Sequence, residues 1–217
     1  MVEFNDIKGV AFDMDGVIAD TAKFHTMAWR QLAESLGVTW NPELQENLKG
    51  IGRMDSLNMI LEAGDIVDKY SDAQKEALAT SKNDAYKELI ATLTPDDILP
   101  GMKNFLDELQ ENGYQMSVAS ASKNAPFILE RLGLTSYFVG IVDPASLHAG
   151  KPDPEIFARA AEILDLDPHY VMGLEDSEAG IQSIRGANEL AIGIGVTGDV
   201  TLASTQEVSL AAIKAQV

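Results

Sequence analysis

The sequence predicts an α/β protein built on a doubly wound parallel sheet, with a bundle of helices inserted after the first strand. Three observations support this prediction. Residues 7–13 have the apolar pattern of a buried strand, residues 19–94 show only helical patterns, and strands alternate with helices from residue 100 onward. Such alternation is typical of right-handed βαβ units. We therefore expect a core domain of residues 1–18 and 95–217 and a helical domain of residues 19–94.

The inserted block shows four helical patterns. Apolar residues recur at helical spacing from Thr21 to Leu36, and Gly37 is a natural end for this helix. Pro42 is suited to the first turn of a second helix, and Ser71 is the expected N-cap of the longest one. The predicted helices are residues 21–36, 42–49, 56–62 and 72–92.

From Pro100-Gly101 onward, glycine and proline separate alternating strands and helices. After Gly195 we expect only a last helix, and we find no functional motif there. The predicted strands are residues 114–119, 140–142, 170–174 and 190–195, and the predicted helices are residues 102–112, 125–132, 154–164, 179–187 and 205–215.

Composition excludes several classes of protein. The formal net charge of −18 makes nucleic acid and anionic membranes poor partners for the molecule as a whole. The absence of cysteine excludes disulfides, thiolate nucleophiles and Cys-ligated zinc. Acidic residues interrupt the first apolar run, and no stretch of 18 apolar residues exists to span a membrane. We therefore expect a cytoplasmic protein.

Two carboxylates, Asp13 and Asp15, follow the first predicted strand and lie next to Gly16. Burying ionised carboxylates costs several kcal/mol unless a cation or hydrogen-bond donors compensate. Gly16 allows a tight turn or a close approach to a ligand. The pattern indicates a metal-assisted nucleophile with an acid/base partner. The alternative is a solvated loop whose acids merely end the strand.

The other predicted strands also end in polar residues, and the carboxyl ends of parallel strands share one edge of a sheet. Lys151 lies in a backbone restricted by Pro152 and Pro154, which favours a functional role. Asp13, Glu175 and Asp176 are oxygen ligands of the kind that Mg²⁺ prefers. The three segments that follow the later strands are Ser120-Ala121-Ser122-Lys123-Asn124, Lys151-Pro152-Asp153-Pro154 and Gly173-Leu174-Glu175-Asp176-Ser177.

These residues predict phosphoryl transfer. A carboxylate and a phosphate dianion repel each other, so a metal ion must bridge them, and Lys151 can neutralise the remaining charge. Asp13 would be the nucleophile that forms an aspartyl phosphate. Asp15 would protonate the leaving oxygen and then activate the next acceptor hydroxyl. The two carboxylates can differ in protonation if only one faces the metal.

The motifs resemble, in order and over the whole chain, the four motifs of the haloacid dehalogenase-like (HAD) superfamily. A helical insertion after the first strand is similar to the cap of its subclass I. Within the superfamily the chain most resembles the sugar-phosphate mutases. The segments that carry this resemblance are Asp13–His25, Ala28-Trp29, Leu48–Arg53, Lys82–Asp84, Ser120–Asn124, Lys151 and Gly173–Ser177.

The resemblance implies an isomerase that interconverts β-D-glucose 1-phosphate and glucose 6-phosphate through a phospho-Asp13 enzyme and β-glucose 1,6-bisphosphate. It also implies Mg²⁺ bound by Asp13, the backbone carbonyl of Asp15, Glu175 and Asp176. The remaining residues fall into three groups: Ser120, Ala121 and Lys151 at the transferring phosphate; Arg53, Ser122, Lys123 and Asn124 at the distal phosphate; and Thr21, His25, Lys49, Gly50 and Lys82 around the acid/base residue and the sugar.

Several of these residues also have a simpler interpretation. His25 is a lone helical histidine, a kind of residue that is usually structural or solvated. Arg53 lies in a loop beside Gly52, which suits a flexible phosphate clamp but also a surface arginine. Helical lysines such as Lys49 and Lys82 are usually exposed. The two tryptophans, Trp29 and Trp40, are better explained by packing within the helical domain than by stacking on a sugar.

The sequence must distinguish a mutase from a phosphatase and from an inactive binding protein. A HAD-type sugar-phosphate phosphatase would use water in place of the sugar hydroxyl, and the fold cannot distinguish it from a mutase. A mutase must hold a bisphosphate in two orientations, which requires cations such as Arg53 and Lys123 far from the transferring group. A catalytically inactive binding protein would have lost the acids that this chain retains. We therefore predict a monomeric mutase of small sugar phosphates, whose cap closes at hinges near residues 19–21 and 92–96 and excludes water.

Overall fold

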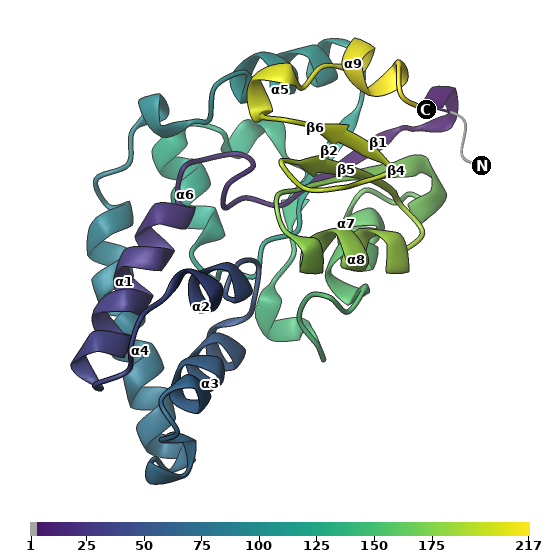
Figure 1. The fold of residues 1–217 in the computed structure, drawn as a ribbon. Coiled ribbons are helices and arrows are strands. Elements are labelled where there is room, and N and C mark those ends of the chain that lie inside the picture. Colours follow the sequence, from purple (N-terminus) through teal and green to yellow (C-terminus); the bar gives the residue numbers. More distant parts are fainter. Residues whose placement is uncertain (1–3) are drawn as a thin grey trace.

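The computed structural model describes residues 4–217 and confirms the predicted doubly wound α/β fold (Figure 1). The order of the parallel strands changes direction beside β1, the place where ligands bind in such sheets. The order is β3-β2-β1-β4-β5-β6, with β1 at Gly9–Phe12, β2 at Gln115–Val118, β3 at Gly140–Ile141, β4 at Val171–Glu175, β5 at Leu190–Ile194 and β6 at Val200–Leu202.

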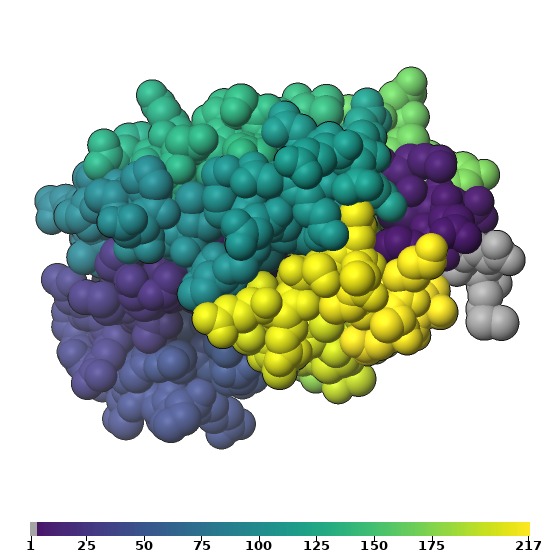
Figure 2. Space-filling view, turned by 90° about the horizontal axis from the view of Figure 1, so that it is seen from above, coloured from purple at the N-terminus to yellow at the C-terminus, as the bar shows by residue number. Residues whose placement is uncertain are grey.

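Helices cover both faces of this sheet (Figure 1). On one face, Phe12 of β1 makes edge-to-face contacts with Phe105 and Phe138, at centroid distances of 6.2 and 5.9 Å. Figure 2 looks onto this face and shows α9 beside α5. The helices of this face are α5 (Met102–Glu111), α6 (Ala125–Leu132) and α9 (Leu210–Lys214), and those of the opposite face are α7 (Glu155–Ile163) and α8 (Glu178–Gly186).

The inserted segment forms four helices that lie beside the sheet (Figure 1). Trp29 and Leu57 belong to an apolar cluster formed by this segment alone. Ser71 caps the longest helix as predicted, because its hydroxyl accepts from the N–H of Gln74, whose side chain accepts from the N–H of Ser71. Within residues 4–217, no helix has the apolar length that crossing a bilayer takes. The four helices are α1 (Ala22–Ser35), α2 (Pro42–Asn47), α3 (Arg53–Ala63) and α4 (Asp72–Ile90).

Two linkers join this helical segment to the sheet, and they are hydrogen-bonded to each other. The N–H of Asp20 donates to the carbonyl of Asp97 at 3.2 Å, and the N–H of Leu99 donates to the carbonyl of Ile18 at 3.0 Å. An isolated antiparallel bridge pairs Ala19 with Ile98 between these bonds. The chain therefore leaves and re-enters the core through a short two-stranded connection.

Most predicted elements are confirmed with bounds that differ by a few residues, and the C-terminal region differs most. The helix predicted for residues 205–215 is a 3₁₀ turn at Thr205–Glu207 followed by α9. Ser209 between them is extended and accepts from the N–H of Ala212, so it begins a new helix. Strand β6 was not predicted, because it has only three residues and its central Thr201 is exposed.

Glu189, immediately before β5, is a buried carboxyl whose two side-chain oxygens have no hydrogen-bond partner among residues 4–217. Burial raises its pKa well above the ordinary value. We expect Glu189→Met to stabilise the fold by about 1–3 kcal/mol at pH 8, because an unsatisfied buried group costs that much. Thermal unfolding of both proteins between pH 4 and pH 8 measures the effect.

The stability gain should depend on pH in one direction. The raised folded pKa of a carboxyl costs no stability below the unfolded pKa, and it destabilises the fold progressively as pH rises toward the folded value. The advantage of Glu189→Met should therefore shrink as pH falls toward 4. Glu111→Met on the exposed end of α5 is the control and should change little. An advantage that grows at acid pH would contradict this prediction.

Candidate active site

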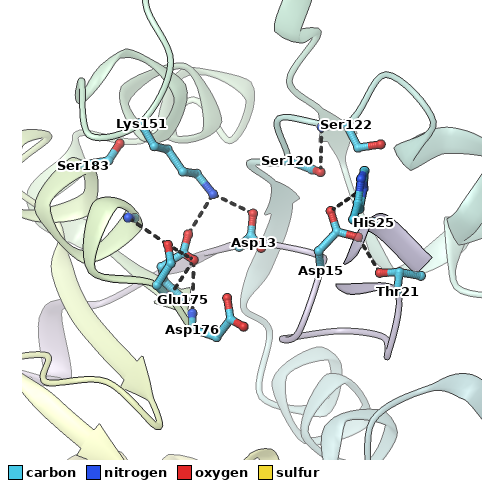
Figure 3. A network of polar contacts seen from close by, with 12 residues as sticks. Asp13, Asp15, Thr21, His25, Ser120, Ser122, Lys151, Glu175, Asp176 and Ser183 are labelled. Carbon is cyan, nitrogen blue, oxygen red and sulfur yellow. Dashed lines mark hydrogen bonds and ion pairs between the residues drawn. The ribbon is translucent and has the colours of Figure 1, made fainter. Parts of the chain in front are cut away.

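The strand ends bring the predicted acidic residues together (Figure 3). Asp13 directly follows β1 and is buried, and Glu175 ends β4 beside it. Gly16 turns the chain between Asp15 and α1 with a φ of +85°. A Cβ on Gly16 would lie 2.1 Å from Oδ2 of Asp176, so only glycine fits at this position.

Asp13, Glu175 and Asp176 form one acidic cluster, in which one oxygen from each lies within 4.8 Å of the others. Burial, and then repulsion from Glu175, raise the pKa of Asp13 well above its ordinary value and that of Asp176 to about 7. Lys151 partly compensates, since its Nζ donates to Asp13 at 2.6 Å and to Glu175 at 2.7 Å. Three crowded carboxylates with one buried lysine fit a divalent cation such as Mg²⁺.

Glu175 is held in a single orientation by its neighbours (Figure 3). Its Oε1 accepts from the backbone N–H groups of Asp176 and Ser177, each at 3.1 Å, and from the Ser177 hydroxyl at 2.8 Å. Ser177 also begins α8, because its Oγ accepts from the N–H of Gly180. A Cβ on Gly180 would lie 2.0 Å from the Glu175 carboxyl, so this glycine leaves space for the carboxylate.

Asp15 has different neighbours from Asp13 (Figure 3). The Thr21 hydroxyl donates to Oδ1 of Asp15, and Nε2 of His25 lies 3.5 Å from Oδ2. Burial alone would raise the pKa of Asp15, but the charge and hydrogen bonds of His25 and Thr21 outweigh it and lower that pKa. The pKa values of the two carboxylates are therefore shifted in opposite directions, so their environments differ as predicted, but the shifts are the reverse of those that a nucleophilic Asp13 and a proton-donating Asp15 require.

Lys82 is buried on α4, so its interpretation as an exposed helical lysine is wrong. Its Nζ lies 2.8 Å from Nδ1 of His25 and 4.4 Å from the ring centroid of Trp29. Burial lowers the pKa of Lys82 to about 7. His25 is likewise not a solvated histidine: it stacks on Tyr86 at a centroid distance of 4.0 Å. Burial lowers the pKa of His25 more than the nearby Asp15 raises it.

Arg53 is the first residue of α3. It is linked to the core through Asn83 of α4, a residue that was not predicted to belong to the site. Nη2 of Arg53 donates to Oδ1 of Asn83 at 2.8 Å, and Nδ2 of Asn124 donates to the same oxygen at 3.0 Å. Arg53 is thus not a solvated surface arginine, and burial lowers its pKa.

The loop before Arg53 lies against the core. Gly50 has a φ of +69°, and a Cβ there would lie 2.9 Å from the Ser177 hydroxyl. Lys49 forms an ion pair with Glu46 at 2.8 Å and keeps a partly exposed side chain. Because the Ser177 hydroxyl also donates to Glu175, this loop lies next to the acidic cluster.

One cavity contains most of the predicted site. Trp29 belongs to the apolar cluster of the helical segment, as predicted, but both it and Trp40 also line the cavity. Of the predicted residues, the lining includes Asp13, Asp15, His25, Lys49, Gly50, Arg53, Lys82, Ala121, Ser122, Asn124 and Asp176.

Other predicted residues lie outside the lining. Thr21, Ser120, Lys151 and Glu175 are buried behind it, and the exposed Lys123 is not brought to the cavity. The lining residues that were not predicted as site residues are Ala22, Thr26, Gln45, Leu48, Ile51 and Asn83. Both tryptophans, for which packing was the preferred interpretation, line the cavity as well. The helical spacing of Ala22, Thr26 and Trp29 with His25 could have identified the α1 members of this group.

Comparison with known proteins agrees with this geometry. The chain belongs to the haloacid dehalogenase-like hydrolase family, whose model matches residues 7–188. Within that family it is a homologue of β-phosphoglucomutase. It is 42% identical to the Bacillus subtilis β-phosphoglucomutase over 209 residues, which cover 94% of this chain and 92% of that protein. This homology supports the phosphomutase prediction and, with it, an isomerase.

Two further relatives place the chain within the family. A crystal structure of β-phosphoglucomutase from Clostridium difficile superimposes with a TM-score of 0.93 at 38% identity, covering 97% of this chain and 96% of that one. A phosphorylated-carbohydrate phosphatase from Thermotoga maritima is 28% identical over 83% of this chain and 82% of its own length. The family therefore includes both of the activities that the sequence left open.

Proposed function

We propose that this chain is a Mg²⁺-dependent phosphomutase that interconverts β-D-glucose 1-phosphate and glucose 6-phosphate. One observation carries the proposal: a single cavity has an acidic centre with Asp13 and Asp176 on the core side and a basic wall with Lys49, Arg53 and Lys82 on the helical side. A bisphosphate has an anionic group at each end, and only a site with two separate centres can hold it in both orientations. The Bacillus subtilis homologue supports this assignment.

The carboxylate of Asp13 would attack the transferring phosphorus atom, and the bond from phosphorus to the sugar oxygen would break. Asp15 would protonate that oxygen as it leaves, and because its pKa is lowered in the unliganded site it would first have to take up a proton. In the other half-reaction, Asp15 would remove the proton from the free hydroxyl of a newly bound sugar monophosphate. That hydroxyl would attack the phosphoryl group on Asp13, the bond from phosphorus to Asp13 would break, and the bisphosphate would form. The bisphosphate turns end for end between the two half-reactions, so one pair of carboxylates performs both transfers.

The other residues would bind and orient. Mg²⁺, held by Asp13, Glu175, Asp176 and the backbone carbonyl of Asp15, would neutralise charge on the transferring phosphate. Ser120 and Lys151 would bind that phosphate. Arg53, Ser122 and Asn124 would bind the distal phosphate, whereas Lys123, which does not line the cavity, would not contact it. Thr21 and His25 would hold Asp15 toward the sugar oxygen, with Lys82 fixing the imidazole through Nδ1.

We further propose that residues 19–94 act as a cap domain on a core of residues 1–18 and 95–217. Support comes from the separate apolar cluster of the four helices and from the paired linkers near Ala19 and Ile98. Closure would exclude water, so that a sugar hydroxyl rather than water attacks phospho-Asp13.

The proposal extends to cofactor, partners and location. β-Glucose 1,6-bisphosphate would serve as intermediate and activator, and the only partners would be small sugar phosphates. We expect a cytoplasmic monomer that binds neither nucleic acid nor membranes, since the net charge of −18 disfavours both.

A coupled assay tests the proposed activity. With β-glucose 1-phosphate, Mg²⁺ and a trace of β-glucose 1,6-bisphosphate, we expect glucose 6-phosphate to form with little free phosphate. Glucose 6-phosphate and inorganic phosphate are measured in the same samples. α-Glucose 1-phosphate is the matched control substrate and should not be converted. Stoichiometric release of phosphate without isomerisation would instead show a sugar-phosphate phosphatase.

A further inference from the structure

The side chain of Asn83 contacts two parts of the cavity wall at once. Asn83 lies on α4 and is only 7% exposed. Its Oδ1 accepts from Nη2 of Arg53 at 2.8 Å and from Nδ2 of Asn124 at 3.0 Å. Arg53 is the first residue of α3, and Asn124 immediately precedes α6 in the core. A single amide oxygen therefore joins α3 and α4 of the inserted segment to the core.

Hydrogen bonds continue from Asn124 along the segment that follows β2, toward Ser120. The Ser122 hydroxyl accepts from the N–H of Asn124 at 3.3 Å, and the Ser120 hydroxyl accepts from the N–H of Ser122 at 3.1 Å. Asn83 thus connects Arg53, on the helical side of the cavity, with Ser120, beside the nucleophile. No other described contact of Arg53 bridges to the core in this way.

We propose that Asn83 is a positioning residue that assembles the distal phosphate site and thereby favours ligands that carry a distal phosphate over inorganic phosphate. This inference rests on the proposed function. The guanidinium of Arg53 has five N–H donors, and the amide of Asn124 has two, so one bond each to Asn83 leaves donors for a phosphate. The site is complete only when α4 lies against the core.

The amide is the group that suits this position. A carboxylate in place of the Asn83 amide would bind Arg53 more tightly and cancel the charge that a phosphate needs. A neutral acceptor orients the guanidinium and leaves its charge available. An apolar side chain would release both Arg53 and Asn124. The effect of a negative charge at residue 83 can therefore be distinguished from the effect of losing the hydrogen-bond acceptor by comparing Asn83→Asp with Asn83→Ala.

The test compares Asn83→Asp and Asn83→Ala in the full-length protein carrying Asp13→Asn, which prevents turnover. Calorimetry with Mg²⁺ measures the affinity for β-glucose 1,6-bisphosphate and for inorganic phosphate, which probes the transferring site. We expect the affinity for the bisphosphate to fall about 30-fold in Asn83→Asp and about 10-fold in Asn83→Ala, with inorganic phosphate changed less than about twofold. Asn104→Asp and Asn104→Ala on the exposed side of α5 are the controls.

Two further readouts separate positioning from a merely structural role. The loss in Asn83→Asp should shrink at lower pH, where the new carboxylate is protonated. With Asp13 intact, the Asn83 variants should raise KM for the sugar monophosphate while kcat changes less than about threefold. Because Asn83→Asp preserves volume, it keeps the test valid if Asn83→Ala does not fold.

Unchanged affinity for the bisphosphate in both variants would overturn the inference, as would an equal loss of affinity for inorganic phosphate. These outcomes are independent of the proposed activity. If the wild-type chain does not isomerise β-glucose 1-phosphate, the proposed function fails, whereas the binding comparison still decides the role of Asn83.

Discussion

Asp13→Asn is expected to abolish phosphoenzyme formation and to lower mutase turnover by about 10⁴-fold or more, because an amide cannot attack phosphorus. Intact-protein mass spectrometry after exposure to β-glucose 1,6-bisphosphate detects the phosphoenzyme, and the coupled assay measures turnover. Asp13 is the carboxylate that Lys151 contacts at 2.6 Å, so the substitution removes the centre of the acidic cluster.

The same substitution should not destabilise the fold in the absence of metal. Burial and repulsion from Glu175 raise the pKa of Asp13, so its ionised form is disfavoured in the folded state at neutral pH. A neutral amide removes that repulsion, and thermal unfolding of Asp13→Asn should occur at an equal or higher temperature. Asp72→Asn, at the exposed start of α4, is the control. Normal turnover by Asp13→Asn would show that another residue is the nucleophile.

Lys151→Met is expected to destabilise the protein by about 3–5 kcal/mol, because removing one partner of a buried ion pair leaves the other charge uncompensated. The Lys151 side chain is fully buried and donates to both Asp13 and Glu175. Turnover should also fall by about 10³-fold, the range found for removal of a single electrostatic group at a reacting centre. Denaturant unfolding and the coupled assay measure the two effects.

The loss of stability should shrink at acid pH, where the protonated carboxyl of Asp13 no longer needs a cation. Lys103→Met is the matched control, because Lys103 pairs with Asp107 at 2.7 Å but both side chains are largely exposed. A surface pair of this kind contributes about 0–1 kcal/mol. Equal losses from Lys151→Met and Lys103→Met would contradict the role assigned to the buried pair.

The sequence predicted those site residues that lie at the end of a strand, because the strands themselves could be recognised from their apolar pattern. Asp13, Ser120 and Lys151 each follow a strand in the structure, and Glu175 ends one. Parallel strands share one edge, so the convergence of these residues could be predicted before the fold was known. Gly16 likewise predicted a tight turn after Asp15, and the Asp176 carboxylate beside it shows why this position needs a glycine.

Contacts between distant side chains could not be predicted in this way. Asn83 is 30 residues from Arg53 and 41 from Asn124, and its helix has no apolar stripe that would show which side faces the cavity. The burial of Lys82 depends on the same orientation of α4. The lowered pKa of Asp15 required the position of His25, which lies on another element. Packing, rather than local pattern, determines each of these features.

The paired linkers have a mechanical consequence. Because Asp20 bonds to Asp97 and Leu99 to Ile18, the two connections are joined side by side, and we expect any opening of the helical segment to bend both of them together. A part tethered in this way has little translational or rotational freedom to lose when it closes on a ligand. We therefore expect the affinity for sugar phosphates to depend chiefly on the contacts made inside the cavity, and hardly on the entropy of bringing its two walls together.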